Sequence, residues 1–211
     1  MPEVHLEVLP KRQKALWREL QSHADLLKKF GFYLAGGTGL SLQIGHRQSV
    51  DFDFFSPLPD TGEGLHPWLE GFAGLVLRAR DRDTVNAEIK KVKVSFIGGY
   101  KYPLLRKEVS LGNIKAAGIA DIGLMKLLAI THRATLRDYL DLAVILRDHV
   151  RLPQLLKLSR KKYGRRFNVM LPLKALVSFQ DIENEKPVLF DKRLAGSWKT
   201  ILIRAVKEMT A

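Results

Sequence analysis

Apolar residues recur at helical spacing near the start of the chain and again throughout its second half. The spacing predicts a helix over residues 11–30, which Gly31 ends, and another around residues 68–77. In the second half it predicts helices over residues 121–133, 136–149, 152–163, 171–180 and 197–209.

Short runs between the early helices have the alternation of strands. FYLA at 32–35 predicts a buried strand, and VDFDFF at 50–55 predicts one that directs Val50, Phe52 and Phe54 into the core. VNAEIKKVKVSFI at 85–97 is also typical of strand structure. The pattern therefore predicts an α+β domain over residues 1–118 and an all-helical domain over residues 119–211.

Composition limits the class of protein. The chain has 211 residues, of which 46% are hydrophobic and 27% charged, as in ordinary globular proteins. It has no cysteine, which excludes disulfides, thiolate nucleophiles and cysteine-based zinc sites. The N-terminal segment lacks the apolar region of a signal peptide, and no apolar run is long enough to span a bilayer. We expect a cytoplasmic protein with no membrane partner.

The net charge of +13 is concentrated in the second half. Residues 1–100 hold 13 basic and 12 acidic residues, whereas residues 101–211 hold 22 basic and 10 acidic ones. Such a field attracts polyanions, so nucleic acid or an acidic protein is the expected partner. A basic surface that only maintains solubility is the alternative.

Candidate chemistry is densest in GGTGLSLQIGHRQSVDFDFF, residues 36–55. Alternation places Asp51 and Asp53 on one face of a strand, and two carboxylates that close together favour a hard divalent cation such as Mg²⁺ or Mn²⁺. A glycine pair at a strand-to-helix turn lets backbone N–H groups approach a phosphate. The residues that would bind the phosphates of a nucleoside triphosphate (NTP) are Gly36, Gly37, Thr38, Arg47 and Ser49.

Neither half of this motif is specific by itself. Gly-Gly-Thr commonly caps a helix, and Asp-x-Asp commonly lies on a solvated strand face. Together they resemble the first motif of the polymerase-β-type nucleotidyltransferase superfamily. The Arg-x-Ser-x-Asp-x-Asp ending, Arg47 to Asp53, resembles that of the AbiEii/AbiGii toxin family of bacterial nucleotidyltransferases. The resemblance implies a polymerase-β-like core, with a short mixed sheet flanked by helices, that uses an NTP and Mg²⁺ or Mn²⁺.

A second block, residues 121–146, resembles the later motifs of that family. Lys126 and Arg133 lie seven residues apart on one predicted helix, and Asp138 and Asp141 share a face of the next. The resemblance implies that Lys126 contacts the nucleotide and that Asp138 completes the catalytic site. The alternative is that these side chains form only a structural lattice of ion pairs between two helices.

One expected residue is missing. The superfamily usually has a third carboxylate on a neighbouring strand, and Ser95 occupies that position here. Asp83 or Glu88 would replace it if the strand register were shifted. The general base is therefore unassigned. His46 is a candidate to assist catalysis, although a loop histidine next to an arginine is more often exposed, which is what we expect here.

The resemblance implies transfer of a nucleoside monophosphate (NMP) to an acceptor hydroxyl. The basic segment KLSRKKYGRRF, residues 157–167, favours RNA as the acceptor, and in the family some members modify transfer RNA as the toxin of a toxin–antitoxin pair. A protein or small-molecule acceptor, or a non-catalytic nucleotide- or RNA-binding module, is the alternative, and an antitoxin protein is a further expected partner. The predicted acceptor-binding residues are Arg133, Arg160, Lys161, Lys162, Arg165 and Arg166.

Overall fold

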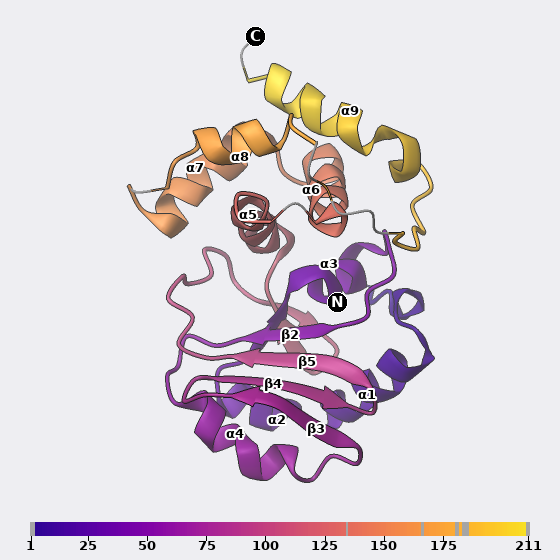
Figure 1. Cartoon of the computed structure of the whole chain (residues 1–211), viewed down its shortest axis with the longest axis vertical. Coiled ribbons are helices and arrows are strands. Elements are labelled where there is room, and N and C mark those ends of the chain that lie inside the picture. The colour runs from indigo at the N-terminus through magenta and orange to yellow at the C-terminus, as the bar shows by residue number, and fades with distance from the viewer. Residues whose placement is uncertain (1–2, 134, 166, 180–181, 183–185, 210–211) are drawn as a thin grey trace.

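The computed structural model describes residues 3–209 except 134, 166, 180–181 and 183–185. These residues form a sheet covered by helices, followed by a helical half (Figure 1). The predicted α+β class is confirmed. The helices are α1 (Lys11–Ser22), α2 (Ala24–Lys29), α3 (Gly36–Ile44), α4 (Thr61–Leu69), α5 (Ile119–Ala129), α6 (Leu136–Asp148), α7 (Leu152–Tyr163), α8 (Met170–Ala175) and α9 (Leu194–Lys207).

The sheet is mixed, and its middle strands carry the first motif. The strands are β1 (Tyr33–Ala35), β2 (Phe52–Phe55), β3 (Leu75–Arg80), β4 (Thr84–Ile89), β5 (Val92–Ile97), β6 (Val109–Leu111) and β7 (Ile114–Ala116). Their order is β3-β4-β5-β2-β1-β7-β6. Strand β2 runs antiparallel to β1 and parallel to β5. Asp53 is thereby held between two neighbouring strands rather than at an edge, and Asp51 lies one residue before β2.

Helices α1, α2 and α4 lie behind the sheet in Figure 1. They cover the face that buries Phe52, Phe54 and Phe96, and these residues share one apolar core with Leu16 and Leu20 of α1. The opposite face, turned toward the viewer, carries the side chains that alternate with that core. Asp53 therefore projects away from the main core because its neighbours on the strand point into it.

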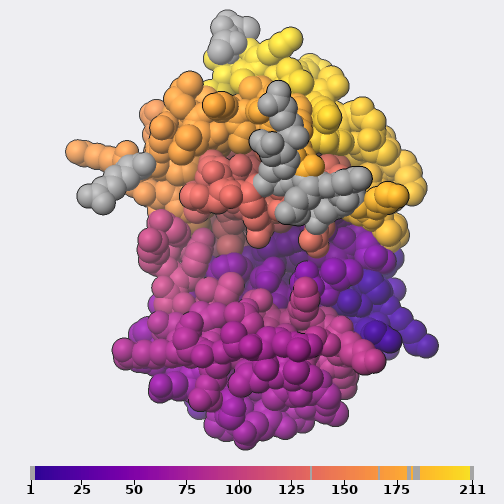
Figure 2. Space-filling view, in the orientation of Figure 1, coloured from indigo at the N-terminus to yellow at the C-terminus, as the bar shows by residue number. Residues whose placement is uncertain are grey.

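The helical half has its own apolar core, which includes Leu127, Leu142, Leu155 and Leu202. In Figure 2 it sits on the sheet-containing half as an orange-to-yellow cap. A third, smaller cluster joins the two halves and packs Tyr33, Ala35 and Leu40 against Ile122 and Ile145. No helix within the described ranges is long and apolar enough to cross a membrane.

Several boundaries differ from the sequence prediction. The helix predicted over residues 11–30 is two helices, α1 and α2, which meet at His23. The helix predicted around residues 68–77 is mostly wrong, because α4 ends at Leu69 and Leu75 begins β3.

The long strand predicted over residues 85–97 is a hairpin. Lys90 and Lys91 both have positive φ, +53° and +64°, which is the geometry of a tight two-residue turn. Val50 is also different from its prediction, since it is 37% exposed and lies before β2 rather than in the core.

Candidate active site

The glycine pair lies at the junction of β1 and α3, where any other side chain would collide. Gly36 has a φ of +63°, and a Cβ atom there would lie 2.7 Å from Oδ2 of Asp53. A Cβ on Gly37 would lie 2.5 Å from the guanidinium of Arg47. Both glycines therefore allow charged groups to approach the N-terminus of α3 closely.

The two carboxylates emerge at the start of β2. Asp53 is half-buried, and burial followed by the charge of Asp51 raises its pKa above the ordinary value. Ser95 is its direct partner on β5 and gives it a hydrogen bond that opposes this rise. Asp51 is more exposed, at 40% of its side chain, with Arg137 4.0 Å away. The pair thus carries a repulsion that a bound cation would relieve.

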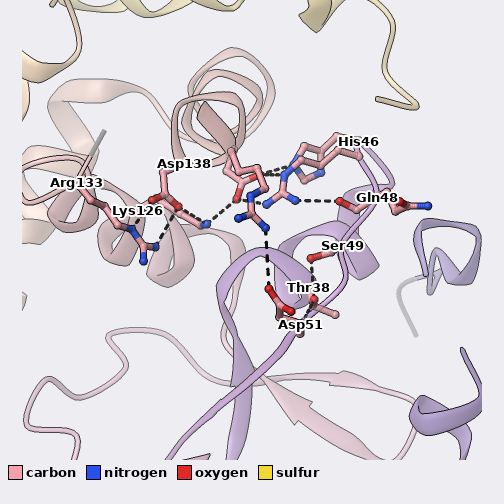
Figure 3. Close-up of polar contacts among 11 residues, drawn as sticks. Thr38, His46, Gln48, Ser49, Asp51, Lys126, Arg133 and Asp138 are labelled. Carbon is pink, nitrogen blue, oxygen red and sulfur yellow. Dashed lines mark hydrogen bonds and ion pairs between the residues drawn. The ribbon is translucent and has the colours of Figure 1, made fainter. Parts of the chain in front are cut away.

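Thr38 and Ser49 are buried and tie α3 to the segment before β2. The Thr38 hydroxyl lies 2.7 Å from the hydroxyl of Ser49 and also hydrogen-bonds to the backbone carbonyl of Asp51. These contacts hold the Asp51 backbone against the first turn of α3 (Figure 3).

Asp141 is fully buried at the junction of the two halves and receives three basic side chains. Arg47 donates two hydrogen bonds to it, of 2.6 and 2.8 Å, and His46 lies 2.7 Å away. Nζ of Lys126 is 2.7 Å from its other oxygen. Burial alone would raise the pKa of Asp141, but the charges of Arg47 and Lys126 outweigh burial and hold the pKa well below its ordinary value. His46 is buried rather than exposed, contrary to prediction, and burial lowers its pKa.

Lys126 also pairs with Asp138, which precedes Asp141 in α6. Its Nζ lies 2.6 Å from Asp138, and Arg133 donates to the other oxygen of Asp138 at 2.8 Å (Figure 3). The lattice of ion pairs weighed as an alternative is therefore present. Arg133 nevertheless keeps 64% of its side chain exposed, so the lattice also presents positive charge to solvent.

The lattice forms one wall of a cleft of about 290 Å³, and the first motif forms the other. Of the residues predicted to act in catalysis or nucleotide binding, all of which the structure describes, only Gly36 is absent from the lining, and Gly36 lies directly behind Asp53. Thr135 and Arg137 also line the cleft and were not predicted as site residues; their position beside Asp138 in the second block was the available signal. The lining residues are Gly37, Thr38, Arg47, Ser49, Asp51, Asp53, Lys126, Arg133, Thr135, Arg137 and Asp138.

The two acidic residues considered as a replacement for the third carboxylate lie elsewhere. Glu88 is opposite Lys93 in the sheet and pairs with Arg78 at 2.7 Å. Asp83 accepts a hydrogen bond from the backbone of Asp60. The register is not shifted, and the described residues contain no group of three or more acidic or histidine side chains suited to a metal ion.

The predicted acceptor-binding segment is only partly on the surface. Lys162 differs from its prediction because it is buried, pairs with Asp121 at 2.8 Å and donates to the carbonyl of Pro103 at 2.7 Å. Arg160, Lys161 and Arg165 are exposed at the end of α7. Arg166 lies outside the described residues.

Comparison with known proteins finds a matching family model, a relative in sequence and solved structures of similar fold. The family model described as "Nucleotidyl transferase AbiEii toxin, Type IV TA system" matches residues 18–210. An uncharacterized protein of Aquifex aeolicus, aq_aa25, is 38% identical over 160 residues, which cover 73% of this chain and 76% of that protein. MenT4, a nucleotidyltransferase toxin of Mycobacterium tuberculosis, has a similar structure with a TM-score of 0.62 and 18% identity, covering 98% of this chain and 87% of that one.

JHP933 of Helicobacter pylori shares the fold at a TM-score of 0.54 and 17% identity, with 96% of this chain and 95% of that chain covered. At these identities the solved structures establish the fold, whereas the family model spans nearly the whole chain and includes both motifs. The chain therefore belongs to the AbiEii family of nucleotidyltransferase toxins.

Proposed function

We propose that this nucleotidyltransferase moves an NMP from an NTP to a hydroxyl of RNA, and that it is the toxin of a toxin–antitoxin pair. The observation that carries the proposal is the cleft in which Asp51 and Asp53 face Lys126 and Arg133 beside the glycine turn. Paired carboxylates next to fixed cations suit a polyphosphate bound with a metal ion.

Asp51 and Asp53 would hold Mg²⁺ or Mn²⁺. Their oxygens are the hard ligands that such ions prefer, and the raised pKa of Asp53 reflects a site where an added positive charge is favourable. With Ser95 opposite Asp53, the protein supplies two carboxylates, so substrate oxygens and water would complete the coordination. The ion would neutralise charge on the phosphates and lower the pKa of the acceptor hydroxyl.

The remaining cleft residues would bind and orient the NTP. Lys126 and Arg133 are held by Asp138 in fixed positions and would contact phosphate oxygens, while the N-terminus of α3 at Gly37 presents backbone N–H groups. The Arg47 guanidinium lies over Gly37 and is oriented by Asp141. In an in-line displacement the acceptor oxygen bonds to the α-phosphorus, pyrophosphate leaves and the hydroxyl proton is released.

RNA is favoured as the acceptor because of where the positive charge lies. Residues 101–211 carry 22 basic and 10 acidic residues, and α7 ends in exposed cations, Arg160 and Lys161. Transfer RNA is the acceptor that the family resemblance suggests. The proposal also includes two domains, residues 1–118 and 119–211. It further includes an antitoxin protein as partner and a cytoplasmic location.

The experiment is transfer of label from each α-labelled NTP to total bacterial RNA with Mg²⁺ or Mn²⁺. The double variant Asp51→Asn, Asp53→Asn should lose activity by about a hundredfold or more, as expected when preorganised charge at a reacting phosphate is removed. Asp25→Asn is the control, because Asp25 is an exposed aspartate of α2. Label on protein instead of RNA would refute the acceptor, and equal activity of the double variant would refute the site.

A further inference from the structure

A second cleft, of about 480 Å³, lies on the segment between β5 and β6, residues 98–108. In Figure 1 this segment rises from the sheet toward the helical half. The cleft is lined mainly by aromatic and aliphatic groups, which come from three segments of the sheet domain, residues 31–33, 57–58 and 100–108. We call it the tyrosine cleft and define it by Tyr33, Leu58, Tyr100, Tyr102 and Leu104.

The outer wall of the tyrosine cleft is fixed by a buried ion pair. Asp121 accepts hydrogen bonds from the backbone N–H groups of Leu105 and Arg106, at 2.9 and 3.0 Å. Lys162 pairs with Asp121 and also binds the carbonyl of Pro103. A buried ion pair is costly unless its geometry satisfies other groups, and this pair satisfies the backbone of one loop. The loop is therefore held in place before any ligand arrives.

A continuous series of aromatic contacts links this wall to the strand that carries Asp53. The ring of Phe55 is 4.9 Å from that of Tyr100, which is 5.8 Å from that of Tyr102. Phe55 is two residues after Asp53, so both side chains point to the same face of β2, about 7 Å apart along the strand. The aromatic surface thus begins next to the proposed metal-binding carboxylates.

Polar groups accompany the rings. Tyr163 packs edge-on against Tyr102 at 4.8 Å, and its buried hydroxyl has no hydrogen-bond partner among the described residues. Burial, followed by the charges of Tyr102 and Asp121, raises the pKa of Tyr100 to about 12. The hydroxyl of Tyr100 is therefore a hydrogen-bond donor at any physiological pH.

Exposed cations outnumber the one acidic residue of the lining, Glu108, at the opening. Arg106 and Lys107 belong to the lining, and Nζ of Lys101 lies 5.0 Å from the centre of the Tyr102 ring. Tyr100 and Tyr102 are partly exposed, and Lys101 and Lys107 beside them are exposed. Accessible rings next to cations are the arrangement with which proteins bind single-stranded nucleic acid, because bases stack on the rings while cations contact phosphates. An aliphatic ligand would use the rings but not the cations.

We propose that the tyrosine cleft binds an unpaired base of the acceptor RNA, at or next to the nucleotide that receives the NMP. The proposal rests on the proposed function and adds the position of the acceptor end. The base stacks on Tyr100 or Tyr102, and the backbone of the strand runs past Lys101 and Lys107. The reacting hydroxyl is thereby brought along β2 to Asp53.

The first test changes the RNA and leaves the protein intact. Binding is measured by fluorescence anisotropy, without NTP or metal, for an RNA stem with a single-stranded 3′ overhang. The same RNA with its last two nucleotides made abasic should bind about tenfold more weakly, within the range found for loss of stacking. Equal affinity for the two RNAs would overturn the proposal.

Variants then locate the effect. With Tyr102→Ala, the intact RNA should bind about tenfold more weakly and the abasic RNA as it does to the wild type, so the two become equal. Tyr102→Phe keeps the ring and should retain the preference for the intact RNA. A misfolded variant would instead lose affinity for both RNAs, and thermal unfolding identifies it. Persistence of the preference in Tyr102→Ala and in Tyr100→Ala would refute the placement.

Two further outcomes separate this proposal from the proposed function. If the wild type transfers label to RNA while the alanine variants lose affinity for a fluorescent NTP rather than for RNA, the cleft binds the base of the NTP and the acceptor assignment is wrong. If the wild type neither binds nor labels RNA, the proposal that RNA is the acceptor is refuted. The proposal that the tyrosine cleft binds a base of that RNA is then refuted as well.

Discussion

Replacing Asp141 with asparagine should test whether the two halves are held together by a buried charge. The substitution preserves the volume of the side chain, so any loss of stability arises from charge and hydrogen bonding rather than from a cavity. Arg47 and Lys126 would keep their positive charges at 2.6 and 2.7 Å from a neutral group. His46 would face the same neutral amide.

The expected loss of stability follows from the burial of Asp141 and its partners. The Asp141 side chain is 0% exposed and those of Arg47 and Lys126 are 2% and 8% exposed, so water cannot replace the lost charge. Removing one partner of a buried ion pair typically costs about 3–5 kcal/mol. For a chain of this length each kcal/mol lowers Tm by about 2–4 °C, which predicts a decrease of about 6–20 °C.

Thermal and urea unfolding of Asp141→Asn and of Glu208→Gln would measure this difference. Glu208 pairs with Arg204 at 2.8 Å but is half exposed, so its loss should change stability by less than about 1 kcal/mol. Because the pKa of Asp141 is lowered in the folded state, its contribution is present at neutral pH and is lost as pH falls toward that lowered pKa. Equal, small losses in both variants would refute the reasoning.

Two further predictions concern the carboxylate pair. Asp53→Asn should abolish transfer yet raise Tm at neutral pH by about 2–4 °C, because the raised pKa of Asp53 means that its charged form destabilises the fold. This gain in Tm should vanish in acid, where Asp53 of the wild type is protonated. Calorimetry at several pH values checks both expectations. Ser95→Asp would place a third carboxylate opposite Asp53 and should tighten Mn²⁺ binding roughly tenfold in a calorimetric titration. Ser95→Asn is the control, and unchanged affinity of Ser95→Asp for Mn²⁺ would contradict the proposed metal position.

Local pattern was sufficient for the elements that carry the first motif. Strand alternation placed Asp53 opposite the buried Phe52 and Phe54, and the glycine pair placed the start of α3. Ser95 was named as the position where the third carboxylate is absent, but its placement opposite Asp53 comes from the pairing of β2 with β5, which the sequence did not predict. The strand alternation and the glycine turn depend on neighbours within a few residues, which a periodicity can report.

Features that depend on distant partners were not predictable in the same way. Leu75 to Leu77 continue a helical pattern in the sequence, but pairing with β4 makes them a strand. Lys162 belongs to a run of cations that predicts a solvated helix end, and only the fold brings Lys162 to Asp121. The same holds for the loop 98–108, whose aromatic residues have no periodic pattern in the sequence.

The arrangement around Asp141 changes how the helical half is understood. Composition alone suggested a basic acceptor-binding unit attached to a catalytic core. Lys126 on α5 and Asp138 on α6 line the same cleft as Asp51, and Asp141 on α6 orients Arg47 from the sheet domain. The cleft is complete only when both halves are in contact, so a fragment that ends before α5 would lack its fixed cations. Catalysis and acceptor binding should therefore depend together on the packing of α5 and α6 against α3.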